Sequence, residues 1–159
     1  MKTIFHPDQY GHHVRTRLSG GALTTALEVP DRARVLLAAA EGCTEAVVAP
    51  GPADLALIRR VHDADYLDFL ETGFAAWKQR FPASEELRPS LHPNAYMRRL
   101  PQDLLGRAGY YIADAASVLL ADSWSAILAS GATAIDATTR VLNGERAAYA
   151  LCRPPGHHA

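Results

Sequence analysis

Residues 147–159 read AAYALCRPPGHHA, and this stretch says most about the fold and the function of the chain. Its apolar first part, residues 147–152, predicts a buried β-strand, because a short run of apolar residues is typical of strands inside a sheet. The polar last part begins where that strand ends. Ligands and reactive groups in open α/β sheets gather beyond the carboxyl ends of the strands. The position of this segment therefore makes it a candidate functional site.

The residues after the strand present two imidazoles on a stiff backbone. Pro154 and Pro155 restrict the chain and lack N–H donors, while Gly156 permits a tight approach. His157 and His158 follow directly, and two imidazoles in different environments can divide the roles of general base and electrostatic or acid partner. An arbitrary pair of adjacent histidines is also typical of a solvated turn. On the residues by themselves, both interpretations stay open.

Upstream of this segment, short apolar strands alternate with helices, which predicts the α/β class with a parallel sheet. Two more strands are expected, at residues 2–6 and 46–49. Helices are expected from Pro30 to a left-handed cap at Gly42, over residues 53–60, 63–80 and 103–120, and from Ser123 to Asn143. The first of these helices has an apolar stripe of Val35, Leu36 and Ala39. In the third, Tyr66, Leu67, Leu70, Phe74 and Trp77 predict one buried face.

Two long connections interrupt this alternation. Residues 7–29 are polar and include Gly20 and Gly21, and residues 81–101 contain four prolines and little periodicity. Neither shows a clear strand or helix pattern, so both are expected to be irregular. Long loops of this kind are often functional. They are therefore candidates for a pocket rim or a subunit contact.

Composition narrows the class of protein. The chain has 159 residues, 48% hydrophobic and 21% charged, with a net charge of −1, which predicts one globular domain without affinity for nucleic acid. No apolar run is long enough for a membrane span, and no signal peptide is visible. Cys43 and Cys152 lack metal-ligand spacing, so reduced core thiols and a cytoplasmic location are expected.

The final heptapeptide resembles the signature shared by class II histone deacetylases and bacterial acetylpolyamine amidohydrolases. Residues 61–71, with the sequence VHDADYLDFLE, are similar to another segment of that family. Residues 109–111 and the pair Ser123 and Trp124 add correspondences in the same order. The similarity extends from Gly20 and Gly21 to the last residue. The chain therefore resembles the N-terminal portion of the proteins in this family.

This resemblance implies the arginase–deacetylase fold, a three-layer α/β/α arrangement with an eight-stranded parallel sheet. Residues 1–159 would be the N-terminal part of a single histone deacetylase-like domain, with about three strands, and the remainder of the domain would be absent. The family uses zinc to polarise an amide carbonyl and activate water. His158 would then transfer the proton and His157 would stabilise charge. The implied substrate is a small acetylated amine or an acetyl-lysine-type amide, and the implied assembly is a homodimer.

The chain departs from the family in its metal ligands. The family's Asp-X-His pair and its later Asp are expected beyond residue 159, so no zinc ligand is expected in this chain and the 159 residues by themselves are expected to be inactive. His12 and His13 form the other histidine pair, and a solvated loop is the interpretation we favour for it. A second possibility is a truncated, non-catalytic module that associates with a partner or with a complete paralogue.

The resemblance also locates a substrate pocket, to which Gly156, Arg17 and Asp114 are assigned. Family members place acidic residues at the positions of Arg17, Leu105 and Ala116, and none of these is acidic here. A cationic polyamine would be repelled by Arg17, because burying like charges together is costly. We therefore expect a less cationic acylated amide, unless Asp114 compensates. Drift at rim positions without selective meaning is the alternative.

Overall fold

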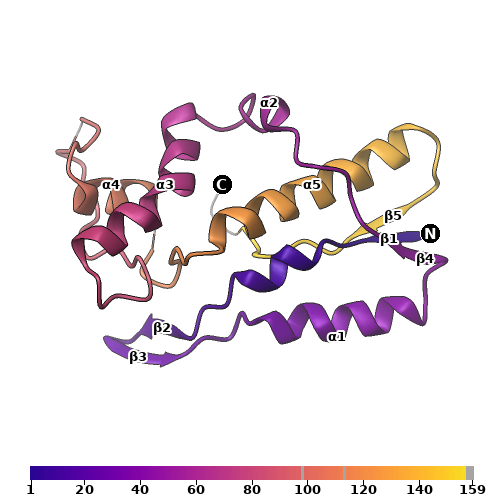
Figure 1. The fold of residues 1–159 in the computed structure, drawn as a ribbon, viewed down its shortest axis with the longest axis horizontal. Coiled ribbons are helices and arrows are strands. Elements are labelled where there is room, and N and C mark those ends of the chain that lie inside the picture. The colour runs from indigo at the N-terminus through magenta and orange to yellow at the C-terminus, as the bar shows by residue number, and fades with distance from the viewer. Residues whose placement is uncertain (98, 113, 157–159) are drawn as a thin grey trace.

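A computed structural model describes residues 1–97, 99–112 and 114–156. It confirms the α/β class and the three expected parallel strands (Figure 1). The elements are β1 (Lys2–Ile4), η1 (Pro7–Gly11), β2 (Thr16–Ser19), β3 (Ala22–Thr25), α1 (Pro30–Glu41), β4 (Ala46–Val48), α2 (Leu55–Ile58), α3 (Ala64–Arg80), α4 (Leu104–Tyr111), α5 (Ser123–Leu142) and β5 (Ala148–Ala150).

The parallel sheet has the strand order β4–β1–β5, so the first strand of the chain is in the middle. Lys2 pairs with both Ala46 and Ala148, and this register continues to Ile4, Val48 and Ala150. Crossovers through α1 and through α5 join the strands. A sheet connected in this way gathers the carboxyl ends of all its strands at one edge.

Alternate side chains of the strands point to opposite faces, and each face is covered by a helix. Phe5, Tyr149 and Leu151 pack against Ala33 and Leu37 of α1. The other face, which carries Ile4 and Ala150, is covered by α5, and Figure 1 shows α1 and α5 on opposite sides of the strands. The three-layer α/β/α arrangement expected from the sequence is therefore confirmed.

A second apolar cluster lies beside the sheet and joins α3 to α4. The expected face of α3 is confirmed, since Leu67, Leu70 and Trp77 are buried in this cluster and Tyr66 and Phe74 pack against it. The described residues between 81 and 101 are irregular, as expected, and Leu87 of this stretch lies in the cluster and forms a bridge with Leu119.

The stretch of residues 7–29 is more ordered than the sequence predicts. It contains the 3-10 helix η1 and the antiparallel hairpin β2–β3. Gly20 and Gly21 form the two-residue turn, with φ of +58° and +81°. A type I′ hairpin turn needs positive φ at both positions, which glycine adopts at little cost. The glycine pair therefore marks a hairpin, and the expectation of an irregular loop is wrong here.

Helix α1 differs from its prediction in two details. Gly42 has φ of −81° and is not a left-handed cap. The predicted apolar stripe is also wrong, because Val35 and Leu36 are exposed. Ala33 and Ala40 are buried on this helix, and Ala33 packs against Phe5 and Leu151, so a small side chain lets α1 approach the strands closely.

The helix expected over residues 103–120 ends at Tyr111. Asp114 accepts hydrogen bonds from the backbone N–H groups of Ala116 and Ser117 at 2.7 and 2.8 Å. A short acidic side chain that binds its own backbone in this way competes with helix formation. After this turn the chain reaches Leu119, which forms a bridge with Leu87.

Both cysteines are free thiols, as expected, but they are not in the core: Cys43 and Cys152 are exposed. Over the part of the chain that the structure describes, no helix is both long enough and apolar enough to cross a membrane.

Candidate functional site

The segment that carries the predicted site leaves the sheet at the carboxyl end of β5. The N–H of Leu151 donates to the carbonyl of Ile4 at 3.0 Å, which continues the pairing with β1 by one residue. The chain then passes through buried Arg153 and a cis peptide bond to half-buried Pro154, and Pro155 and Gly156 are exposed. His157 and His158, the predicted catalytic pair, lie outside the described residues.

Arg153 is 2% exposed and contacts three residues from the first 28 of the chain. Its Nε and one terminal nitrogen donate to the two carboxylate oxygens of Glu28, at 2.8 and 2.9 Å. Its terminal nitrogens also donate to the carbonyls of Gln9 and His12. Two parallel N–H···O bonds between a guanidinium and a carboxylate are the strong geometry for this pair of groups.

Gln9 links this arginine to helix α5. Its side chain is fully buried, its Oε1 accepts the backbone N–H of Arg153, and its Nε2 donates to Thr133 Oγ1 at 3.2 Å. Thr133 donates in turn to the carbonyl of Ala129 at 2.8 Å. A buried amide is costly unless it is hydrogen-bonded, and here both ends of the amide have partners. The start of the functional segment is thus held by η1 and by α5.

His12 is buried, which contradicts the solvated loop expected for the His12 and His13 pair. Its Nδ1 lies 2.9 Å from Ser123 Oγ at the start of α5, and that oxygen accepts the N–H of Leu120 at 2.7 Å. The serine hydroxyl is therefore free to donate to Nδ1, which favours a neutral ring with its proton on Nε2. Burial first, and the charge of Arg153 second, lower the pKa of His12 from 6.5 to about 4. His13 is exposed, as expected.

Sequence reasoning missed the supporting residues Gln9, His12, Glu28 and Arg153. Gln9 and His12 stand in a polar stretch without periodicity, and Glu28 precedes a helix like many exposed carboxylates. The only signal was Arg153 itself, a charged residue between an apolar strand and two prolines. Such a charge needs a partner, but the sequence does not say which of the 17 acidic residues supplies it.

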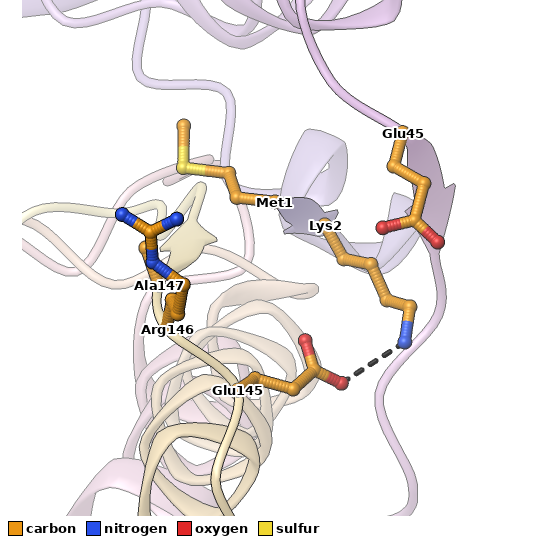
Figure 2. A pocket seen from close by; sticks show the side chains of 6 residues that line it. All are labelled: Met1, Lys2, Glu45, Glu145, Arg146 and Ala147. Carbon is orange, nitrogen blue, oxygen red and sulfur yellow. Dashed lines mark hydrogen bonds and ion pairs between the residues drawn. The ribbon is translucent and has the colours of Figure 1, made fainter.

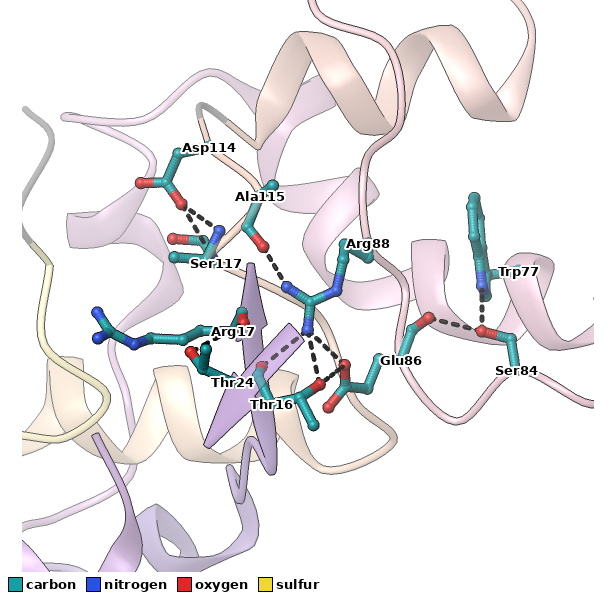
Figure 3. A network of polar contacts seen from close by, with 11 residues as sticks. Thr16, Arg17, Thr24, Trp77, Ser84, Glu86, Arg88, Asp114, Ala115 and Ser117 are labelled. Atoms are coloured by element: carbon teal, nitrogen blue, oxygen red, sulfur yellow. Dashed lines mark hydrogen bonds and ion pairs between the residues drawn. The ribbon is translucent and has the colours of Figure 1, made fainter. Parts of the chain in front are cut away.

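The predicted pocket residues Arg17 and Asp114 lie on two segments that are fastened together (Figure 3). Arg17 is in β2 and half-buried, and among the described residues its buried Nε has no hydrogen-bond partner. Asp114 begins the turn whose Ala116 and Ser117 N–H groups it accepts. A third residue, Arg88, joins these segments.

Arg88 is the centre of this connection. It donates to the Thr16 carbonyl at 2.8 Å, to Glu86 Oε2 at 2.6 Å and to the Ala115 carbonyl. One guanidinium therefore bridges the hairpin, the irregular stretch of residues 81–101 and the turn that begins at Asp114. A surface pocket beside it is lined by Arg15, Thr16, Ser84, Glu85, Glu86 and Arg88. Arg17, Asp114 and Gly156 do not line it.

A second pocket lies at the opposite edge of the sheet, where the strands begin (Figure 2). It is lined by Met1, Lys2, Glu45, Glu145, Arg146 and Ala147. Lys2 Nζ and Glu145 Oε1 form an ion pair of 2.9 Å across it. Because it is at the amino ends of the strands, this pocket is separate from the predicted site.

Over residues 1–97, 99–112 and 114–156, no group of three or more His, Cys, Asp or Glu side chains could hold a metal ion. Catalytic zinc takes three protein ligands and one open position. The described residues therefore do not form a zinc site.

A parallel α/β/α core, with a rigid polar segment at the carboxyl ends of its strands, defines the architectural class. Within that class, the histone deacetylase domain matches residues 26–159. The chain belongs to this family, and the resemblance inferred from its motifs is confirmed.

Curated relatives agree with this assignment. The chain is 40% identical over 160 residues to an acetylpolyamine amidohydrolase of Mycoplana ramosa, with 100% of this chain and 47% of that protein covered. It is 40% identical over 161 residues to an acetylpolyamine amidohydrolase of Burkholderia pseudomallei, covering 100% of this chain and 46% of that protein. The chain thus spans about half the length of the curated relatives it matches.

Solved structures give the same fold. The acetylpolyamine aminohydrolase from Burkholderia pseudomallei superposes with a TM-score of 0.88 at 40% identity, over 100% of this chain and 46% of that one. The HDA15 HD domain superposes with a TM-score of 0.61 at 18% identity, over 100% of this chain and 38% of that one, and this match bears on the fold only.

Proposed function

We propose that residues 1–159 form the N-terminal part of a single zinc-dependent deacetylase domain that hydrolyses an acetylated amine or an acetyl-lysine-type amide. The observation that carries the proposal is the position of the segment that begins at Arg153, anchored at the carboxyl end of β5 in a histone deacetylase domain. Relatives of the chain named acetylpolyamine amidohydrolases support the same reaction.

In this proposal His157 and His158 act on the proton and the charge of the reaction. His158 takes a proton from the attacking water and later gives it to the leaving amine, while His157 stabilises the charge that develops. Imidazole side chains are suited to proton transfer because the ordinary pKa of histidine lies near neutral pH. Support comes from the rigid lead-in of Pro154 and Pro155, which restricts the backbone directly before the pair.

The zinc ion belongs to the proposal through the family, and its ligands are assigned to residues outside 1–159. In this proposal residues 1–159 contribute the imidazole pair and the contacts that hold Arg153 in front of it. The polypeptide of residues 1–159 is accordingly proposed to be inactive without the remaining part of the domain.

Substrate choice is proposed to depend on the β2–β3 hairpin. Arg17 is half-buried there, and its buried Nε has no hydrogen-bond partner among the described residues. A second cation brought close to it would be repelled. We therefore assign Arg17, Asp114 and Gly156 to the substrate pocket and favour a less cationic acyl amide over a polyamine.

The cellular setting is also part of the proposal. Free thiols at Cys43 and Cys152 support a reducing compartment, the cytoplasm.

A homodimer is supported by the cross-strand pair Leu18 and Leu23, both exposed on the hairpin. Sedimentation equilibrium of the full-length protein tests the dimer, and a monomer at micromolar concentration would refute it.

The reaction is tested with zinc-loaded full-length protein, acetylputrescine and a neutral acetylated amide. We expect hydrolysis of both, a higher kcat/KM for the neutral amide, and loss of at least about 1000-fold in kcat in His158→Ala. Arg17→Glu should shift the preference towards acetylputrescine. Absence of hydrolysis of any acyl amide by zinc-loaded protein would refute the activity, whereas a wild-type preference for acetylputrescine would refute only the role of Arg17.

A further inference from the structure

Arg153 is a buried charge at the point where the functional segment leaves the sheet. Its contacts with Gln9, His12 and Glu28 reach back over at least 125 positions of the chain. They use four of the five N–H donors of the guanidinium. A guanidinium held on several sides by fixed acceptors has one orientation available, because its donors form a planar fork.

The backbone of the same residue is held as well. The N–H of Arg153 donates to Oε1 of Gln9, whose side chain is fully buried and donates to Thr133 in α5. Side chain and main chain are therefore both fixed at Arg153, directly before Pro154. Because two prolines follow, the chain has few soft dihedrals between this anchor and Gly156. An orientation set at Arg153 is transmitted along the segment.

Glu28 is the partly exposed member of this group of contacts. Its side chain is 28% exposed, while the side chain of Arg153 is 3% exposed, so the carboxylate lies at the boundary of the core. Glu28 stands between strand β3 and helix α1 and belongs to neither. A carboxylate at this position holds the arginine without being needed to complete a helix or a strand.

We propose that Arg153, Glu28 and Gln9 form a clamp that positions the imidazole pair for proton transfer. These three are positioning residues: they act through the segment of residues 154–158 and do not touch the reacting atoms. The inference rests on the proposed deacetylase function. It predicts that weakening the clamp lowers the rate of the chemical step while substrate binding is retained.

The test compares kcat, KM and zinc content of full-length variants, with acetylputrescine and a neutral acetylated amide as substrates. Glu28→Gln keeps the shape and removes the charge, and Arg153→Lys keeps the charge and removes the fork. Asp31→Asn is the matched control, because the ion pair of Asp31 with Arg34 lies only three residues beyond Glu28 and is exposed.

Glu28→Gln and Arg153→Lys should each lower kcat per zinc-loaded site by about 100-fold, the order of loss that small misplacements of reacting groups cause. KM should stay within about threefold, since uniform binding is kept. The double variant should be no slower than Arg153→Lys, because both substitutions remove one interaction. Asp31→Asn should leave kcat within about twofold, as expected for an exposed pair.

A merely structural clamp gives a different result. In that case Glu28→Gln lowers the melting temperature or the zinc-loaded fraction, while kcat per loaded site stays within about threefold of wild type. That outcome overturns the inference.

If wild-type protein hydrolyses neither substrate, the proposed function fails and a second readout decides the inference. Hydrogen exchange at the amides of Gly156, His157 and His158 should be at least about tenfold faster in Glu28→Gln, because the anchor before them is loosened. Equal exchange in Glu28→Gln and wild type overturns it.

Discussion

Replacing His12 should change how the stability of the protein depends on pH. The folded state lowers the pKa of His12 from 6.5 to about 4, with burial as the main cause and Arg153 as the second. The unfolded chain therefore binds a proton at a pH where the folded state does not. The contribution of neutral His12 to stability is complete above pH 6.5 and is lost as the pH falls towards 4.

The size of the effect follows from the shift. A difference of one pKa unit corresponds to about 1.4 kcal/mol, so lowering the pKa from 6.5 to about 4 corresponds to about 3 kcal/mol of unfolding free energy between pH 7 and pH 4. His12 is only 9% exposed, so screening by solvent removes little of this. His12→Gln should abolish that part of the acid loss. At pH 7 it should cost about 1–2 kcal/mol, because the bond to Ser123 is disturbed.

The measurement is urea unfolding of the full-length protein from pH 4 to pH 7.5, followed by tryptophan fluorescence. Carboxylates titrate in both proteins, so the difference between wild type and His12→Gln isolates the histidine. His13→Gln is the control, because His13 is exposed and should keep the wild-type profile. If His12→Gln loses as much stability between pH 7 and pH 4 as wild type does, the neutral buried state of His12 is refuted.

Three further outcomes are expected. Gly109→Ala should destabilise the protein by about 3 kcal/mol in denaturant titrations, because a Cβ there would lie 1.5 Å from the carbonyl oxygen of Leu91. Gly51→Ala is the control and should be neutral, because a Cβ at that position meets no atom within 4 Å. Gly21→Ala should cost about 1 kcal/mol by the same measurement, because φ is +81° at that turn position; no loss of stability would contradict the type I′ turn. Chelation should abolish amide hydrolysis by the full-length protein and zinc should restore it, while the polypeptide of residues 1–159 should bind less than one zinc per chain by metal analysis.

Features that depend on residues close together in the sequence were predictable from it. The three strands follow from short apolar runs, α3 follows from its periodicity, and the C-terminal end of α5 follows from the stop signal at Asn143. The predicted stripe on α1 failed because several apolar positions were compatible with a buried face. Only packing against Phe5 and Leu151 selects Ala33 over Val35.

The supporting contacts of the candidate site were not predictable in this way. Glu28 and Arg153 are 125 positions apart, and Gln9 and Arg153 are 144 apart. They meet because β1 lies between β4 and β5, which puts the residues after β1 beside those after β5. The contacts of Arg153 therefore depend on strand order, which a short sequence motif does not reveal.

The same strand order places the long stretch between β1 and α1 beside Arg153. Residues 7–29 supply the carbonyls of Gln9 and His12 and the carboxylate of Glu28, all of which face Arg153. Gln9 belongs to the short 3-10 helix η1, and His12 follows directly after it. The carbonyls at the end of a helix lack partners within that helix, so they are available as acceptors for a buried guanidinium. The same stretch folds back as the hairpin that carries Arg17. This stretch thus does two things: the end of η1 supplies carbonyls to Arg153, and the hairpin carries Arg17, the cationic residue assigned to the pocket.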